Sequence, residues 1–226
     1  MSRILAASII LTLGAAVLSA QSAGRTVQAT GSATILAAPD QAQIDAGVVT
    51  SAATAQDSAQ QNATLTTAVL AAVKAVLGSS GTVQTVSYYV TPRYSTAAGQ
   101  TNVIVGYTTA NTVRVTTGDL SIIGKLIDAA NQAGANSVGN LSFGLQDPEP
   151  KVQQALTQAT KQAMAHAAAI ASGLGATLGT VVTAQEGSSY APVVVPAATA
   201  GGAVTTPVQT GTVSVYASVT VTAQLQ

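Results

Sequence analysis

The sequence predicts an α+β fold, in which an antiparallel or mixed β-sheet has about three helices packed on one face. The first observation is the C-terminal stretch from Thr212 to Gln226, where odd positions from Val213 to Leu225 are apolar and even positions are polar. Successive side chains of a strand point to opposite faces, so this stretch is a long strand with one apolar face. The second observation is that similar alternating stretches occur in pairs, separated by stretches of helical period.

Composition limits the classes of function. Hydrophobic residues make up 47 % of the 226 residues but aromatic residues only 3 %, so the core must consist of small, closely packed side chains. Charged residues are 7 % and the net charge is zero. Without a basic run that could follow a phosphate backbone, we expect no nucleic-acid binding.

The N-terminus has the pattern of a secretory signal peptide over residues 1–23. Arg3 supplies a positive charge, an apolar run reaches Leu18, and the small residues Ser19, Ala20, Ser22 and Ala23 follow. The alternative is an uncleaved anchor, but the run is short for a membrane span and lacks a basic flank behind it. We therefore expect a periplasmic or secreted protein with no membrane span after cleavage. The chain has no Cys, which excludes disulfides and thiolate metal sites.

Residues 24–226 are expected to form one domain, which begins with two strands. Residues 26–37 and 41–50 both alternate, and Pro39-Asp40 lies between them. The short turn predicts an antiparallel hairpin. A helix should follow from Thr54 to Gly78, with an apolar stripe made of Leu65, Val69, Ala72, Val73 and Val76.

A second pair of strands is rich in tyrosine. Alternation runs through Val86, Tyr88 and Val90 up to Pro92, residues 95–100 form the tip, and residues 101–117 return. A strand this long usually carries a bulge, and Gly106 is the candidate position.

The remaining elements alternate between helix and strand. Helices are predicted from Asp119 to Gly134 and from Asp147-Pro148 to about Ser172, with strands around residues 141–145 and 181–184. Residues 187–211 contain several Pro and Gly and are predicted to form an irregular loop before the last strand. The third helix should turn one stripe to the sheet, formed by Leu156, Ala159, Ala163, Ala167 and Ile170.

An ordered set of short motifs is similar to the motifs of a known protein family. It comprises Pro39-Asp40-Gln41-Ala42, the run from Thr85 to Tyr94, the run from Gly106 to Val115, Asp119-Leu120, Gly134-Ala135-Asn136, Leu141-Ser142-Phe143, Leu174-Gly175 and Leu178-Gly179. From Val27 to the C-terminus the chain resembles the SIMPL domain family, also called domain of unknown function 541. The resemblance implies an exported bacterial protein. Similar members include an immunogenic envelope protein, a proposed oxidative-stress defence protein and a eukaryotic kinase-associated adaptor. The resemblance supplies no catalytic residues.

Candidate catalytic groups are few. His166 is the only histidine and lies beside the Ala163–Ala167 stripe, so a boundary or surface role is favoured over a general base. Asp40, Asp119 and Asp147 occupy turn or cap positions, where local backbone bonding explains them. Gly173, Gly175 and Gly179 close a helix and therefore lack phosphate-binding geometry. We expect no catalytic, cofactor-binding or metal-binding residues, and no cofactor.

Four tyrosines form the candidate interaction surface: Tyr88, Tyr89, Tyr94 and Tyr107. Cross-strand packing would explain them structurally. Because neighbours in a strand point to opposite faces, either Tyr88 or Tyr89 should lie on the outer face, where it could bind a partner.

These observations predict an exported, non-catalytic envelope interaction or assembly protein with a link to stress defence. The alternative is a small-molecule binder or a hydrolase with an unrecognised site. We expect a homo-oligomer, and an envelope protein is a further candidate partner. The physical basis is that residues 212–226 and 26–37 carry no charge, so either strand would invite pairing with another copy if it lay at a sheet edge.

Overall fold

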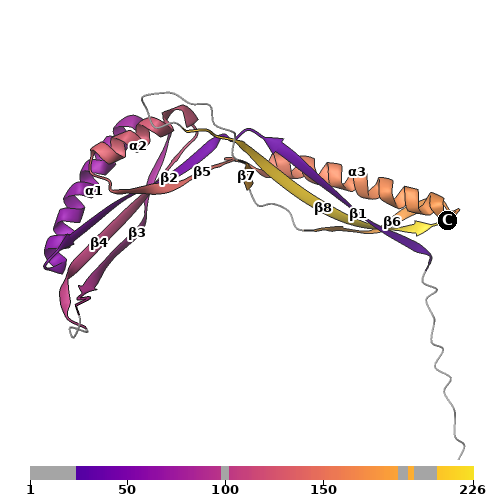
Figure 1. The fold of residues 1–226 in the computed structure, drawn as a ribbon. Helices are drawn as coiled ribbons and strands as arrows, with labels where there is room; N and C mark the ends of the chain where they lie inside the picture. Colours follow the sequence, from indigo (N-terminus) through magenta and orange to yellow (C-terminus); the bar gives the residue numbers. More distant parts are fainter. Residues whose placement is uncertain (1–23, 98–101, 188–192, 196–207) are drawn as a thin grey trace, which may run out of the picture.

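The computed structural model describes residues 24–97, 102–187, 193–195 and 208–226. It confirms the α+β class. Two antiparallel sheets lie end to end, and helices cover one face of each (Figure 1). The predicted signal peptide and most of the predicted 187–211 loop lie outside the described residues.

The first sheet, called sheet A, has the strand order β1-β8-β6, and β7 also pairs with β8. Helix α3 crosses one face of this sheet (Figure 1). The bounds are β1 Thr26–Ala37, β6 Leu178–Glu186, β7 Val193–Val195, β8 Thr212–Leu225 and α3 Glu149–Gly173.

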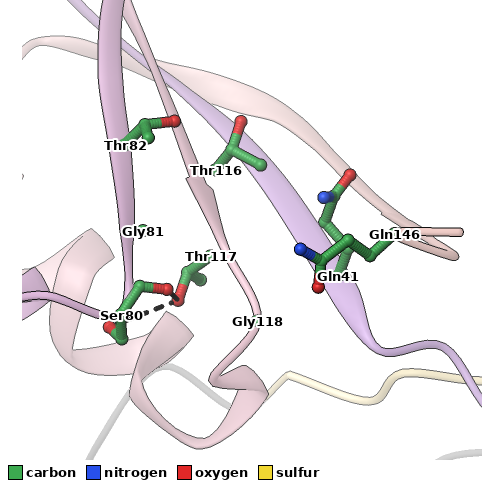
Figure 2. A pocket seen from close by; sticks show the side chains of 8 residues that line it. All are labelled: Gln41, Ser80, Gly81, Thr82, Thr116, Thr117, Gly118 and Gln146. Atoms are coloured by element: carbon green, nitrogen blue, oxygen red, sulfur yellow. Dashed lines mark hydrogen bonds between the residues drawn. The ribbon is translucent and has the colours of Figure 1, made fainter.

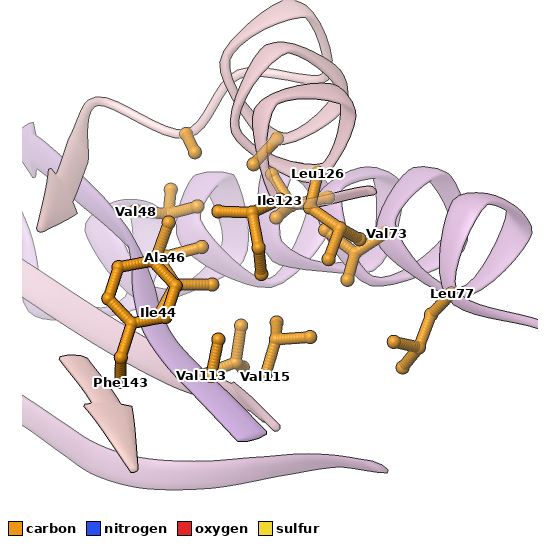
Figure 3. Close-up of a cluster of buried hydrophobic side chains, with 14 residues drawn as sticks. Ile44, Ala46, Val48, Val73, Leu77, Val113, Val115, Ile123, Leu126 and Phe143 are labelled. Carbon is orange, nitrogen blue, oxygen red and sulfur yellow. The ribbon is translucent and has the colours of Figure 1, made fainter. Parts of the chain in front are cut away.

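The second sheet, called sheet B, has the strand order β3-β4-β2-β5, and α1 and α2 pack on one face. Its elements are β2 Gln41–Ala52, α1 Ala55–Leu77, β3 Gly81–Tyr94, β4 Ile104–Thr117, the 3₁₀ turn η1 Leu120–Ile122, α2 Ile123–Gln132 and β5 Ser137–Gly144. The main core lies between this sheet and its helices (Figure 3). Its largest fully buried side chains include Ile123, Leu126, Val48, Val73 and Val113.

The hairpin predicted for residues 26–37 and 41–50 is wrong. All of β1 pairs with β8, whereas β2 pairs with β4 and β5 in the other sheet. The Asp40 turn is tied to the β5–α3 connection, since Asp40 N–H donates to Gly144 O at 3.1 Å and Asp40 Oδ1 accepts from Gln146 N at 2.6 Å. This turn therefore passes the chain from one sheet to the next.

The predicted C-terminal strand is confirmed, but it lies inside sheet A rather than at an edge. Its odd residues from Val213 to Ala223 are buried under α3, as the alternation predicts. Strand β1 forms one edge of sheet A and β6 the other. Two side chains of α3 bond the open edge of β1: Gln162 Oε1 accepts from Ser32 N at 2.6 Å, and His166 Nδ1 lies 2.9 Å from Thr30 O.

Helix α3 packs directly against the backbone of β1 at Gly31. A side chain there would collide with the backbone of Ala159 and Ala163. The fully buried stripe of α3 consists of alanines spaced four residues apart, namely Ala155, Ala159, Ala163, Ala167 and Ala171. The predicted stripe is therefore wrong at Ile170, which is 44 % exposed, because such close contact leaves no room for a larger side chain.

The predicted stripe of α1 is wrong in its N-terminal half. Leu65 is 36 % exposed, and the side chains turned to sheet B are instead Ser58, Asn62, Thr66, Val69, Val73 and Leu77. Backbone carbonyl groups of sheet B accept hydrogen bonds from Ser58 and Asn62. Asn62 Nδ2 donates to Val48 O at 2.8 Å and to Thr109 O at 3.1 Å. Polar side chains can be buried there because each finds a partner.

The bulge predicted at Gly106 is confirmed. Arg93 pairs with Gly106 and Tyr94 with Ile104, so Val105 is the extra residue. Gly106 has a φ of 155°, and a side chain there would meet Ala52 O at 2.8 Å. Glycine is required where another backbone approaches this closely.

Candidate functional site

The structure places the four predicted tyrosines on the hairpin of β3 and β4. Tyr88, Tyr89 and Tyr94 are exposed by 56 %, 52 % and 53 %, and Tyr107 is half-buried. These side chains do not form one cluster. Tyr88 and Tyr89 lie on opposite faces of sheet B, as expected for neighbours in a strand.

The register assigns Tyr88 and Tyr89 to their faces of sheet B. Tyr88 pairs with Asn111, which pairs with the buried Val48, so Tyr88 lies on the face covered by helices. Tyr89 pairs with Ala110, which pairs with Val49, so Tyr89 lies on the outer face. Ala110 is only 4 % exposed although no helix covers that face. The outer face therefore has a small apolar floor next to Tyr89.

Exposed apolar side chains continue along the hairpin. Those beyond the tyrosines are Val86, Val90, Val103, Ile104 and Val105, each between 37 % and 53 % exposed. From Gly81 to Pro92, β3 has no charged residue, and the first charge is at Arg93. Edge strands are usually protected by charge, so this open edge lacks the usual protection over residues 81–92.

The hydrogen-bonding pattern shows which groups of β3 point outward. Gly118 N donates to Ser80 O, so the even-numbered residues of β4 turn their backbone groups to β3. A register shift at Val86 makes Tyr89 the partner of Ala110. The backbone N–H and C=O groups of Tyr89 therefore point to β4. Those of Tyr88 and Val90 point the other way, to the open edge of the sheet.

Sequence reasoning missed one charged constellation on the outer face. Asp45 is 5 % exposed and accepts a bidentate pair from Arg114, with Nε at 2.7 Å and Nη2 at 2.9 Å. Asn140 Nδ2 also donates to Asp45 Oδ2 at 3.0 Å. The Arg114 hydrogen bond, with help from Asn140, holds the pKa of Asp45 below its usual value. Both carboxylate oxygens are occupied, so Asp45 is a poor proton acceptor and instead joins three strands.

The signal for this constellation was weak in the sequence. Asp45 lies inside an alternating strand, and Arg114 becomes its direct neighbour only through the β2–β4 register. Asn140 has a φ of 52° at a bulge of β5, which aims its side chain at Asp45. The left-handed conformation of Asn140 and the bulge around it become visible only once the strand pairing is known.

The other predicted polar residues are bonded locally. Asp119 Oδ1 accepts from Ser121 N at 3.0 Å, and hydrogen bonds from Ser121 lower the pKa of Asp119. Asp147 Oδ1 accepts from Glu149 N at the start of α3. His166 lies on the surface, as predicted, beside Thr30. Among the described residues, no three His, Asp or Glu side chains come close enough to hold a metal ion.

A small polar hollow lies at the end of sheet B near the Asp40 turn. Its volume is about 240 Å³, and the lining residues are Gln41, Ser80, Gly81, Thr82, Thr116, Thr117, Gly118 and Gln146. Figure 2 shows the carboxamides of Gln41 and Gln146 across from Ser80 and Thr117. The lining carries no charge. The hollow is smaller than the roughly 300–1,000 Å³ of a typical ligand pocket.

The comparisons with known proteins identify a family but no function. Residues 27–223 match the family model SIMPL, described as a protein of unknown function (DUF541). No curated protein matches the chain. In the part of the chain that the structure describes, no helix is long and apolar enough to cross a membrane.

Proposed function

The chain belongs to the SIMPL family, whose function is unknown. We propose that it is an exported, non-catalytic interaction and assembly protein of the cell envelope. Its contact surface is the β3–β4 hairpin. The observation that carries this proposal is an open edge strand whose aromatic side chains are exposed on both faces of sheet B.

The state of the polar side chains supports a non-catalytic role. The Asp40, Asp45 and Asp119 carboxylates accept hydrogen bonds from backbone N–H groups or from Arg114. The His166 ring nitrogen Nδ1 is engaged with β1. A general base needs a free lone pair directed at a substrate, and the three carboxylates use lone pairs to hold the fold. Thr30 O can only accept, so His166 donates from Nδ1 and its ring is held against β1.

Exposed aromatic and β-branched side chains are suited to contact a polypeptide. Tyrosine presents a large apolar area with few rotatable bonds and keeps a polar tip, which is why it is enriched at interfaces. An open strand edge adds backbone hydrogen bonds to a partner strand. The partner would be another copy of the chain or an envelope protein, and defence against oxidative stress is the biological setting that we attach to the proposal.

Complementation of a deletion strain tests this proposal. A Tyr88→Lys plus Tyr94→Lys variant places two ammonium groups on the hairpin and should abolish complementation, including peroxide resistance, while circular dichroism stays unchanged. The matched control is Leu36→Lys plus Tyr216→Lys, at positions of sheet A that are 65 % and 42 % exposed. The control should complement. If the hairpin variant complements as well as the wild type, the hairpin is not the contact surface.

The polar hollow favours one alternative, a binder of small neutral molecules. Carboxamides and hydroxyls can bond a polyhydroxyl ligand. The variant Gln41→Ala plus Gln146→Ala separates the two proposals. The interaction role predicts intact complementation by this variant, whereas a ligand-binding role predicts its loss.

A further inference from the structure

We propose that two copies of the chain pair along β3, antiparallel about a two-fold axis at Tyr89, so that their two B sheets become one continuous sheet. This inference rests on the proposed function, because it names the occupant of the β3–β4 contact surface. The occupant is a second copy, and the evidence is the chemistry of the edge itself.

The other long edges are blocked or irregular. Gln162 and His166 bond the open edge of β1. Strand β5, the other edge of sheet B, is interrupted by the bulge at Asn140. Beyond its end, the Asn136 side chain bonds both Val49 N at 2.8 Å and Val49 O at 2.7 Å of β2, as a partner strand would. Strand β6 carries two register irregularities that leave only residues 183–186 in regular pairing, whereas β3 is regular over residues 87–93. No side chain of the described residues makes a comparable hydrogen bond to β3.

Strand geometry selects the register. Tyr88 and Val90 direct their backbone groups outward, so these two residues must form the hydrogen-bonded pairs with a second copy. An axis at Tyr89 pairs Tyr88 with Val90 of the other copy, and Val90 with its Tyr88, which makes four backbone hydrogen bonds. An axis at Tyr88 would instead place Val90 against the bulge at Val86. An axis at Val90 would place Pro92, which has no N–H group, opposite Tyr88, so the outward Tyr88 carbonyl would lack a donor. Only the axis at Tyr89 pairs Tyr88 with Val90, the two residues that offer both an outward N–H and an outward C=O group.

Side chains and charges fit this arrangement. On the outer face, the two copies of Tyr89 form a close, non-hydrogen-bonded pair. On the other face, Tyr88 lies beside Val90 of the second copy, and aromatic–β-branched pairs are favourable across strands. Helix α1 packs mainly on β2 and β4, and Tyr88 is 56 % exposed, so this face has room for a partner. The nearest charge, Arg93, lies opposite Thr85 of the second copy, next to the Val86 bulge, and not opposite the second Arg93.

The cysteine-free chain allows a direct test by disulfide trapping in the full mature chain. Non-hydrogen-bonded pairs place Cα atoms about 4.5 Å apart, within the roughly 4.4–6.8 Å that a disulfide needs. Tyr89→Cys should therefore give a covalent dimer after mild oxidation. Ser87→Cys alone and Thr91→Cys alone should not, because each would be about 14 Å from its own copy at about 3.4 Å per residue. A mixture of these two variants should crosslink, because Ser87 lies opposite Thr91.

The mixture retains Tyr89, so it tests the register even if Tyr89→Cys weakens the contact. Crosslinking of Tyr89→Cys and of the mixture, without crosslinking of the separate variants, is the expected result. Equal crosslinking of all variants, or of none, overturns the proposed pairing. In those cases complementation by the hairpin variants still decides the proposed function, because a different register or a different partner leaves that function intact.

Discussion

Substituting Gly31 by alanine tests the packing of α3 on sheet A. The added methyl group would overlap the backbone of Ala159 and Ala163, including the Ala163 Cα at 3.0 Å, and a helix backbone cannot rotate away as a side chain can. Overpacking of this kind costs about 1–3 kcal/mol. Replacing a glycine also restricts the unfolded chain, which offsets about 0.4–1 kcal/mol. Because both colliding groups are backbone, we expect the upper part of this range and a net loss of about 2 kcal/mol.

Urea unfolding of both proteins measures this difference, and thermal unfolding should show a decrease of about 4–8 °C for a chain of this length. Gly139→Ala is the matched control, because it lies in β5 and a side chain there meets no atom within 4 Å. The control should be neutral or stabilising by up to about 1 kcal/mol. A Gly31→Ala variant as stable as the wild type would falsify the direct contact between α3 and β1.

Three further changes test other contacts. Asn62→Ala leaves Val48 O and Thr109 O without their buried donor and should cost about 1–3 kcal/mol in urea unfolding, whereas the exposed Gln61→Ala should stay within about 0.5 kcal/mol. The folded-state pKa of Asp45 is lowered, so its stabilising contribution is complete above the ordinary aspartate pKa and is lost as the pH falls through the folded-state value. Stability measured against pH should therefore fall less steeply in this acid range for Asp45→Asn, and curves of equal slope would contradict the assignment. Gln162→Ala plus His166→Ala opens the edge of β1, so light scattering should show a larger mass than for the wild type, and an unchanged mass would show that these side chains do not protect the edge.

Local patterns predicted most elements, because each strand and helix follows from the period of its own residues. The alternation from Val213 to Leu225 correctly indicated the face of β8 that α3 covers. Partner choice was not predictable in this way. Strand β1 has the same alternation as β2 and as β8, and only the three-dimensional arrangement decides that it pairs with β8, at the other end of the chain.

Two features of the site depended on such long-range pairing. Tyr88 and Tyr89 could be assigned to opposite faces from the sequence, but their place on an edge strand could not. The Asp45–Arg114 pair joins neighbouring strands whose register is visible only in the structure. The burial of polar side chains was not predictable either. Asparagine in a helix usually indicates a solvent-exposed position, and only the structure shows that Asn62 donates to the carbonyl groups of Val48 and Thr109.

The most direct test of the central claim is the solution mass of residues 24–226, measured by light scattering beside that of Val90→Pro. The Val90 N–H points away from β4, so proline at this position removes a donor to the partner strand without breaking the β3–β4 ladder, as Pro92 already shows two residues further on. Val90→Thr, which keeps the N–H group, is the control. We predict an oligomeric wild type and control, and a folded, monomeric Val90→Pro variant. A monomeric wild type, or a Val90→Pro variant with the mass of the wild type, would contradict assembly through β3.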